Sequence, residues 1–564
     1  MNRCKLSKRV LMGAPSLLVI GLALAALAQS EEPKLAPAGF NNVTNDFTDQ
    51  EKFDADRKAF EDVETILPEK KSTASTKVNK SRHGRASSGD PAGNANGGEA
   101  GGGLGPVYNA TSCVSCHQNP VTGSSSQVSE IRAGRLKDTN DDPNNPKSDF
   151  VEPPGGSLIH QRAIDAQIQE HVQAEDKVRT LRMSTNILGN GFVEVIPDQE
   201  LIDNCKAQPE GMRGLPVAVP VAVRKAGAEF QFVLRVGRFG WKDQEASLLN
   251  FSANAYINEM GITSPLQPTE NKSNGRDVTQ FDPVADPEDE AKNDSPFGED
   301  VEAFARFMRS TRVPPRDFAV AQGEICKDPK KDPLTGGEKV FNDIGCTGCH
   351  RPQYVTPKKD TPIIPLARRE DSIPGTDFGP DDQKGVVPDA LANKIICPFS
   401  DFLLHDIGTK DGIVQTQHAQ LPPLHARRFM QQVPSPFQPK RRSPPAAQPQ
   451  AQQEPLPRST PVSVDECTPE IQEYLPQPSQ PASTNLESRQ ANQERVLDQR
   501  TRHRVRTAPL WGLRVRPQLL HDGSAFTIEE AILAHKEEAR AARMAFEALP
   551  EDQKRALLTF LNSL

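Results

Sequence analysis

Apolar residues recur at helical spacing in several short segments, which polar stretches separate from one another. The pattern runs through residues 49–67, 246–260 and 301–310, and Gly261 is placed to end the second segment. Leucines form an apolar stripe along residues 551–564, at the end of the chain. We therefore expect helices in these four segments.

A different pattern marks one pair of segments as strands. Residues 217–223 and 230–236 are rich in β-branched residues and flank a Lys-Ala-Gly sequence, which predicts a β-hairpin. Pro220 lacks a backbone donor and therefore restricts the first strand to an edge position. Near the C-terminus, Thr527 precedes two glutamates and is placed to cap a further helix. We predict a mainly α fold that contains one small β-hairpin.

Composition limits how much of the chain forms packed core. Only 35% of the 564 residues are hydrophobic, and the chain contains 50 Pro and 38 Gly. We expect residues 29–102 to be largely disordered, 266–300 to be an acidic linker, and 429–491 to be a Pro- and Gln-rich low-complexity insert. Two ordered domains remain, 103–265 and 301–564.

The N-terminus has the pattern of a secretory signal peptide. Residues 1–28 begin with basic side chains, continue with an apolar run from Val10, and end on Ala26-Leu27-Ala28, a small-residue cleavage sequence. An uncleaved membrane anchor is the alternative, because the apolar run is nearly long enough to span a bilayer. We expect export to a bacterial periplasm, with no membrane span after cleavage. A net charge of −8 argues against a nucleic-acid partner.

The sequence Cys-x-x-Cys-His occurs twice, which is the attachment pattern of c-type haem. Two thiols bond to the vinyl groups of one porphyrin, and the adjacent imidazole becomes the proximal iron ligand. A zinc ribbon requires a second ligand pair, which follows neither motif, and a redox dithiol does not explain the two histidines. We expect two c-type haems, held by Cys113, Cys116 and His117 and by Cys346, Cys349 and His350.

Four further cysteines lie outside these motifs and the signal segment, at Cys205, Cys326, Cys397 and Cys467. In an oxidising compartment they allow up to two disulfides, with three possible connectivities. Free buried thiols are the alternative. We expect at least one disulfide, and the position of Cys467 inside the low-complexity insert suggests that the insert is tied down.

Several longer motifs occur in the order expected for one family. They are GLGPVYNATSCVSCH, STNILGNGFVEVIPD, GRFGWK, NEMGITS, DFLLHDIG, RTAPLWGL and LLHDGSAFTIEEAI, which cover most of 103–265 and 300–564. In these motifs the chain resembles the di-haem oxidoreductases, also called thiol oxidoreductases, which are related to bacterial di-haem cytochrome c peroxidases. The resemblance implies two cytochrome c-like lobes. It also implies that Phe341, in the short helix before the second motif, packs near the edge of a haem.

The same resemblance implies roles for two residues. In the peroxidases the N-terminal haem is usually the reactive one, a Trp-containing segment lies between the haems, and a Glu manages protons. Trp241 of GRFGWK is then the inter-haem relay and Glu259 of NEMG the acid/base, although Lys242 and Asp243 depart from the peroxidase pattern. Arg238 or Arg506 would stabilise developing negative charge. Packing and a solvated helix end are the alternative roles of Trp241 and Glu259.

The sequence does not identify the second axial ligand of the C-terminal haem. LLHDG resembles a segment in which the peroxidases place a ligating Met, but this chain has Leu520, which does not bind iron. The candidates are His521, which we favour, and His405, His535 and Met260. For each histidine, a hydrogen-bonded structural role is the alternative.

We therefore expect a peroxidase-like oxidoreductase that passes electrons between two haems. A small redox protein is the expected electron donor or acceptor, and hydrogen peroxide is the candidate substrate. A di-haem electron carrier without a substrate site is one alternative. A secreted interaction protein, whose tails and insert bind a partner, is another. A ferric spectrum separates the first two, because an open iron gives a high-spin component.

Overall fold

The computed structural model describes residues in ten ranges, and residues 33–564 form one unit. The described ranges are 32–66, 103–137, 149–224, 230–292, 295–317, 336–363, 385–409, 411–417, 466–469 and 496–564. The expected signal segment, Cys326 and almost all of the 429–491 insert lie outside them. No helix within these ranges is long and apolar enough to cross a membrane.

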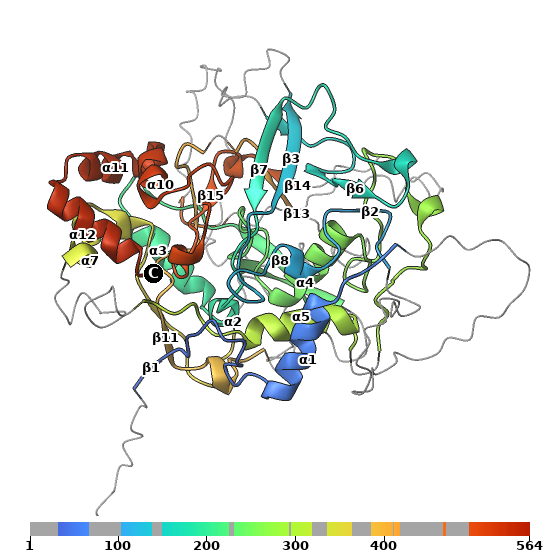
Figure 1. Cartoon of the computed structure of the whole chain (residues 1–564), viewed down its shortest axis with the longest axis horizontal. Coiled ribbons are helices and arrows are strands. Elements are labelled where there is room, and N and C mark those ends of the chain that lie inside the picture. Colours follow the sequence, from blue (N-terminus) through green and yellow to red (C-terminus); the bar gives the residue numbers. More distant parts are fainter. Residues whose placement is uncertain are drawn as a thin grey trace, which may run out of the picture. The chain divides into compact units, whose positions relative to one another are not determined.

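The first part of the chain mixes helices and strands (Figure 1). Its helices are α1 (Gln50–Glu61), α2 (Asn190–Glu194), α3 (Asp198–Ala207), α4 (Leu248–Ala255) and α5 (Glu299–Ser310). Its strands are β1 (Lys34–Leu35), β2 (Val107–Tyr108), β3 (Ser129–Leu136), β4 (Phe150–Val151), β5 (Leu158–Ile159), β6 (Arg162–Ala163), β7 (Val178–Met183), β8 (Ala218–Arg224) and β9 (Phe230–Val236).

The second part ends in three helices. Its helices are α7 (Gly336–Asp343), α10 (Ile528–Ala534), α11 (Arg540–Glu547) and α12 (Glu551–Leu561). Its strands are β10 (Tyr354–Val355), β11 (Lys394–Ile396), β12 (Leu404–His405), β13 (Gln415–Gln417), β14 (Val496–Asp498) and β15 (Val505–Arg506). Short single turns, labelled η, connect many of these elements.

The prediction of a mainly α fold is wrong, because strands form several sheets in the described chain. β3 is the centre of a four-stranded sheet, in which it pairs with β4, β5 and β7. Its sequence, SEIRAGRL, carries charged residues that hide the period-2 pattern. Many other strands are only two residues long and leave no periodic signal at all. The one hairpin that the pattern did reveal is confirmed as β8 and β9, with Pro220 opposite Leu234.

The helices that the apolar period predicts are confirmed. α4 continues into a single π-helical turn over Tyr256–Met260, and Gly261 ends it with a φ of 74°. α5 and α12 lie where the pattern places them. Thr527 forms a capping box with Glu530 at the start of α10. Figure 1 shows α12 beside α7, against which it packs.

Part of the stretch that we expected to be disordered is ordered. α1 packs against α5, where the ring of Phe307 lies 5.4 Å from that of Phe53 and 5.0 Å from that of Phe60. Asp56 is buried and accepts two hydrogen bonds from Arg306, at 3.0 and 3.1 Å. The remaining residues of that stretch, 67–102, lie outside the described chain.

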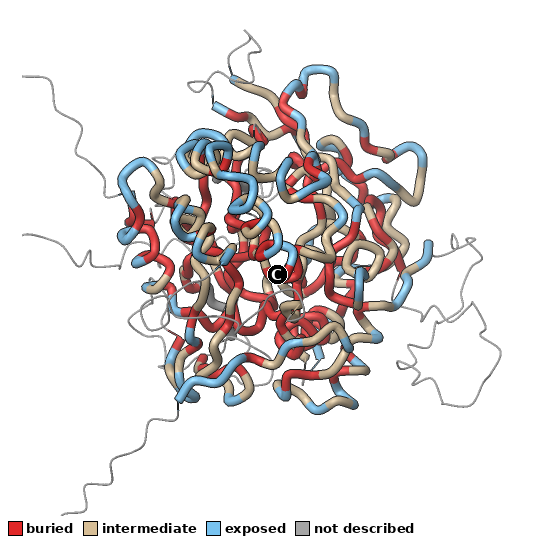
Figure 2. Tube along the Cα trace, turned by 60° about the vertical axis from the view of Figure 1, so that its left-hand side comes forward, coloured by how far each residue is buried: buried red, intermediate tan, exposed pale blue. Residues whose placement is uncertain are grey.

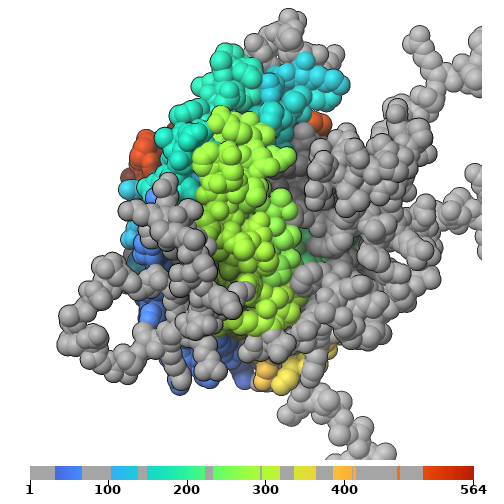
Figure 3. Space-filling view, turned by 90° about the vertical axis from the view of Figure 1, so that its right-hand side faces the viewer, coloured from blue at the N-terminus to red at the C-terminus, as the bar shows by residue number. Residues whose placement is uncertain are grey.

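The acidic stretch before α5 lies against the rest of the protein as a continuous band, coloured yellow-green in Figure 3. Thr263 anchors it: its hydroxyl donates to Asp286 at 2.7 Å, and its backbone N–H donates to Glu288 at 2.9 Å. Val278, within this stretch, is 1% exposed. This stretch is therefore packed, although its sequence resembles that of a linker.

The described chain has two main hydrophobic cores, and Figure 2 shows the buried positions in red. The larger core holds α1, α2, α4 and α5, and Cys113 of the first motif packs against it. The smaller core holds Phe341, Phe399 and the apolar faces of α11 and α12, and Cys346 of the second motif packs against it. Each Cys-x-x-Cys-His motif therefore lies on a core of its own.

The expected disulfide bonding is confirmed. Cys205 in α3 is bonded to Cys467, and the two cysteines are 262 residues apart in the sequence. The bond ties the described residues 466–469, which lie within the predicted insert, to the larger core. Cys397 is also disulfide-bonded.

Candidate haem sites

Both motifs fold into the same short turn. The first occupies a 3-10 turn over Cys113–Ser115, and the second occupies one over Cys346–Gly348. The backbone N–H of the histidine donates to the carbonyl of the first cysteine, at 3.2 Å in the first motif and 2.9 Å in the second. This turn brings the two thiols and the imidazole of each motif together.

The two motif histidines are held alike. Nδ1 of His117 donates to the carbonyl of Ser124 at 3.2 Å, and Nδ1 of His350 donates to the carbonyl of Phe399 at 2.9 Å. This bond fixes the tautomer and leaves Nε2 as the lone-pair donor, as in most histidine–metal sites. Burial lowers the pKa of each imidazole to about 4, so both are neutral at pH 7 and available to a metal.

None of the four motif thiols is in a disulfide. All four cysteines are free and half-buried, in a chain whose described cysteines are otherwise disulfide-bonded. Burial raises the pKa of Cys116 and of Cys346 to about 12, which keeps these thiols protonated. Two free thiols beside one neutral imidazole are the groups that covalent haem attachment requires, so both sites fit the cofactor.

A cleft with a volume of about 200 Å³ opens beside the second motif. Cys346, Cys349 and His350 lie in its wall, and Phe341 and leucines of the smaller core make much of the rest apolar. The ring of Phe341 lies 6.1 Å from that of His350. Arg506 and Arg516 also line the cleft. An apolar slot edged by arginines suits a porphyrin, which is flat and apolar but carries two carboxylates.

The cleft reaches from the second motif to the loop that follows the first motif and bonds to His117. Ser125 and Ser126 line the cleft, and the carbonyl of the preceding Ser124 is the partner of His117. Trp241 also lines the cleft, and its indole N–H donates to the carbonyl of Met183 at 2.8 Å. The predicted relay residue therefore lies in the cleft that the second motif also lines.

A buried charged cluster fixes the segment that carries Trp241. Lys242 is 1% exposed, and its ammonium lies 3.0 Å from Asp411. Arg182 of β7 donates two hydrogen bonds to the same carboxylate, at 3.1 and 3.2 Å. Lys242 also donates to the carbonyls of Thr501 and Arg504. The lysine that departs from the peroxidase pattern is thus a structural anchor.

Glu259 lies beside the first motif, where we expected an acid/base. Its carbonyl accepts hydrogen bonds from the N–H groups of Asn109 and Ala110, at 2.8 and 2.9 Å. Gly105 allows this approach, because a Cβ atom there would lie 1.9 Å from the carbonyl oxygen of Gly261. Among the charged groups near Cys116, Glu259 raises the pKa of the Cys116 thiol most.

The sequence did not reveal the partners of Glu259. Glu130 on β3 shares a hydrogen bond with it, and Arg132 donates to Glu130 at 2.8 Å. Burial and the nearby Glu130 charge raise the pKa of Glu259 to about 8, whereas Arg132 lowers the pKa of Glu130 against the effect of burial. Glu259 therefore holds a proton at pH 7 and donates it to the Glu130 carboxylate. The strand pairing that aligns these residues had no visible period in the sequence.

Two residues with a role predicted from the sequence, Arg238 and Met260, are buried in structural contacts. Arg238 is fully buried and bonds to Asp198 and to the carbonyls of Val236 and Ile196. Met260 is 3% exposed within the larger core. Arg506 differs from both, because it lines the cleft while donating to the carbonyl of Gly240 at 2.7 Å.

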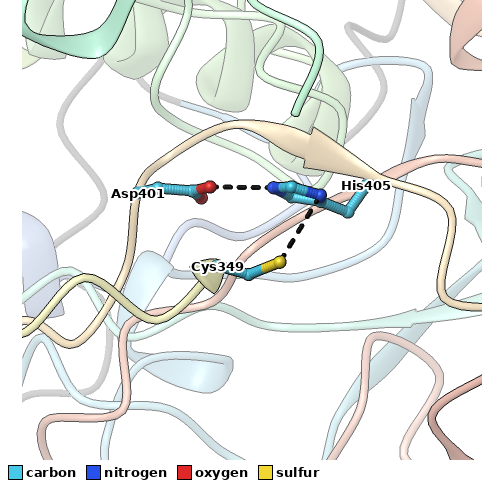
Figure 4. A group of neighbouring side chains, drawn as sticks. All are labelled: Cys349, Asp401 and His405. Atoms are coloured by element: carbon cyan, nitrogen blue, oxygen red, sulfur yellow. Dashed lines mark hydrogen bonds and ion pairs between the residues drawn. The ribbon is translucent and has the colours of Figure 1, made fainter. Parts of the chain in front are cut away.

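His405 cannot offer a nitrogen to iron, because carboxylates hold both of its ring nitrogens. Nε2 lies 2.8 Å from Asp401, and Sγ of Cys349 lies 3.6 Å from Nδ1 (Figure 4). Nδ1 also lies 2.8 Å from Glu538. Burial opposes the charge on this imidazole, but Asp401 raises its pKa well above the ordinary value. Although Cys349, Asp401 and His405 are close enough to hold a metal, the imidazolium–carboxylate bonding accounts for the group.

The two remaining histidine candidates also line the cleft. His521 is 2% exposed, and its Nε2 lies 3.4 Å from both Asp411 and the hydroxyl of Thr180. Its ring packs edge-on against Trp241, with 6.1 Å between ring centres. His535, at the end of α10, has its ring centre 6.5 Å from that of His350.

Residues 160–419 and 494–564 match the family described as "Di-haem oxidoreductase, putative peroxidase". The second Cys-x-x-Cys-His motif, Trp241 and Glu259 lie within this match, and the first motif lies before it. The break in the match overlaps the predicted insert. No curated protein and no solved structure shows a significant match. The match covers more than half of the chain, and the chain therefore belongs to the di-haem oxidoreductase family.

Proposed function

We propose that this protein is an exported, peroxidase-like oxidoreductase that carries one covalent c-type haem on each Cys-x-x-Cys-His motif. Bound haem supplies an iron that stores one electron and, where its distal side is open, takes peroxide. His117 and His350 are the proximal ligands, and the four motif thiols form the covalent links. The free thiols and the carbonyl-bonded imidazoles support this assignment.

The proposal of catalysis at the first motif rests on the Glu259–Glu130 pair. Peroxide reduction needs a proton delivered to the departing oxygen, which a carboxylic acid supplies when its pKa lies near the working pH. Glu259 has a pKa of about 8, is protonated at pH 7, and lies close to Cys116. Glu130 accepts its hydrogen bond, and Arg132 keeps Glu130 ionised. The pair therefore holds one proton in a fixed place.

Trp241 is proposed as the residue through which electrons cross from the second motif to the first. It lines the same cleft as His350 and as Ser125, which follows the residue that bonds to His117, and this shared cleft supports the role. The bond from its indole to Met183 and the Lys242 anchor hold the ring still. We further propose a periplasmic location, hydrogen peroxide as the oxidant, and a small redox protein as the electron donor.

Peroxide-dependent oxidation of a reduced small cytochrome c, measured with haem-loaded protein, tests the proposal. Glu259→Gln keeps the size of the side chain but removes the acid, so kcat should fall roughly 100-fold while haem content is unchanged. The control is Glu551→Gln, at a side chain that is 76% exposed, which should leave kcat unchanged. A Glu259→Gln protein with the parental kcat would refute the role of this residue. Two low-spin haems and no peroxide turnover in the parent would favour the electron carrier.

A further inference from the structure

Two histidines line the cleft with their ring centres at the separation that a shared metal requires. Ring centres of His350 and His535 are 6.5 Å apart, and the ring planes are inclined at 53°. A metal bound about 2 Å from the Nε2 atoms of two opposed imidazoles places the ring centres about 6 Å apart. Both residues line the same cleft, with the thiols of the second motif beside them.

The two rings are also oriented by the same type of bond. Nδ1 of His350 donates to the carbonyl of Phe399 at 2.9 Å, and Nδ1 of His535 donates to the carbonyl of Ala531 at 2.7 Å. Each bond leaves Nε2 as the lone-pair nitrogen. The capping box at Thr527 fixes the start of α10, and this short helix places His535 at its C-terminal end.

The other two histidine candidates bond to carboxylates, His405 through both ring nitrogens and His521 through Nε2. His405 is held by Asp401 and Glu538 through both ring nitrogens. Nε2 of His521 faces the Asp411 carboxylate, within the cluster that also contains Arg182 and Lys242. Leu520, which takes the place of the ligating Met in the related peroxidases, has no donor atom. Our sequence-based preference for His521 therefore gives way to His535.

We propose that His535 is the second axial ligand of the haem on the second motif, opposite His350. This inference rests on the proposed haem attachment and deepens it. With two imidazoles, that iron has no open position and stays low-spin, so it transfers electrons and does not bind peroxide. Peroxide chemistry then belongs to the first motif, where the Glu259–Glu130 pair lies.

Electron paramagnetic resonance of the ferric, haem-loaded protein tests this assignment. We would compare the parent with His535→Ala and with His521→Ala, a control that removes a second histidine from the same cleft. In His535→Ala the bis-histidine low-spin signal should give way to a high-spin signal, and added imidazole should restore it. His521→Ala should keep the low-spin signal. His535→Met, which keeps a ligand, should instead give the near-infrared charge-transfer band of Met-bound iron.

The outcomes separate this inference from the proposed function. A pyridine haemochrome assay first counts the haems in each variant, and a parent without haem would overturn both. A parent with two haems whose bis-histidine low-spin signal survives both His535→Ala and His535→Met would overturn the ligand assignment alone. Loss of that signal in His521→Ala, with His535→Ala unchanged, would assign the ligand to His521.

Discussion

Asp411→Asn removes the charge on which the buried cluster beside Trp241 depends. The carboxylate is fully buried, and Arg182 and Lys242 lie 3.1 and 3.0 Å from it. Asn has the same size but no charge, so two buried cations lose their counterion. The change therefore tests whether this cluster stabilises the wall of the cleft.

The expected cost follows from these distances. At 3 Å and an effective dielectric constant of about 20, each contact is worth roughly 5 kcal/mol before desolvation is counted. Desolvation offsets most of that attraction, and removing one partner of a buried pair costs about 3–5 kcal/mol. Because Asn still accepts a hydrogen bond, we expect a loss of about 3 kcal/mol in the free energy of unfolding.

Urea unfolding of the haem-loaded protein, followed by far-ultraviolet circular dichroism, measures this loss. The control is Asp343→Asn, which breaks the exposed Lys339–Asp343 pair and should cost less than about 0.5 kcal/mol. Burial acts to raise the pKa of Asp411, but Arg182 and Lys242 hold it below the ordinary range. The carboxylate then contributes stability above pH 4, and this contribution is lost as the pH falls through the lowered pKa.

The difference between the parent and Asp411→Asn should thus be constant from pH 7 to pH 5 and shrink in stronger acid. Equal costs for Asp411→Asn and Asp343→Asn would refute the reasoning. So would a difference that grows as the pH falls below 4.

Three further predictions concern the site and its support. Since burial and Glu130 raise the pKa of Glu259 to about 8, peroxide turnover should be level below pH 7 and fall as the pH rises through 8; a profile that rises there contradicts the acid role. Cys467→Ser should lower the free energy of unfolding by about 2–4 kcal/mol, measured by urea unfolding against the oxidised parent, in which the Cys205–Cys467 bond is intact, and no change would show that this bond is dispensable. Trp241→Phe should slow the electron transfer between the haems, followed by stopped-flow spectroscopy, without changing haem content; an unchanged rate would exclude the indole as the relay.

The proposed attachment residues were accessible from the sequence because their chemistry is local. Cys113 to His117 and Cys346 to His350 each occupy one turn, so their spacing states the geometry directly. The helices with a clear apolar period were accessible for the same reason, since one turn repeats the pattern of the last. α5 and α12 are examples.

The features that the sequence hid depend on distant contacts. Glu130 reaches Glu259 only because β3 pairs with β7 and packs beside the first motif, and the charges on β3 conceal its alternation. The sequence favours His521 over His535 as the axial ligand. The contacts of Asp411 with His521, and the approach of α10 to His350, distinguish them in three dimensions.

The central claim is that each motif binds one haem through its two thiols. Intact-protein mass spectrometry of the chain, expressed with a cytochrome maturation system, tests it most directly. The account predicts a mass increase of two haem groups, which falls to one when Cys113 and Cys116, or Cys346 and Cys349, are replaced by Ala. A mass equal to the bare polypeptide, with no Soret absorbance, would contradict it.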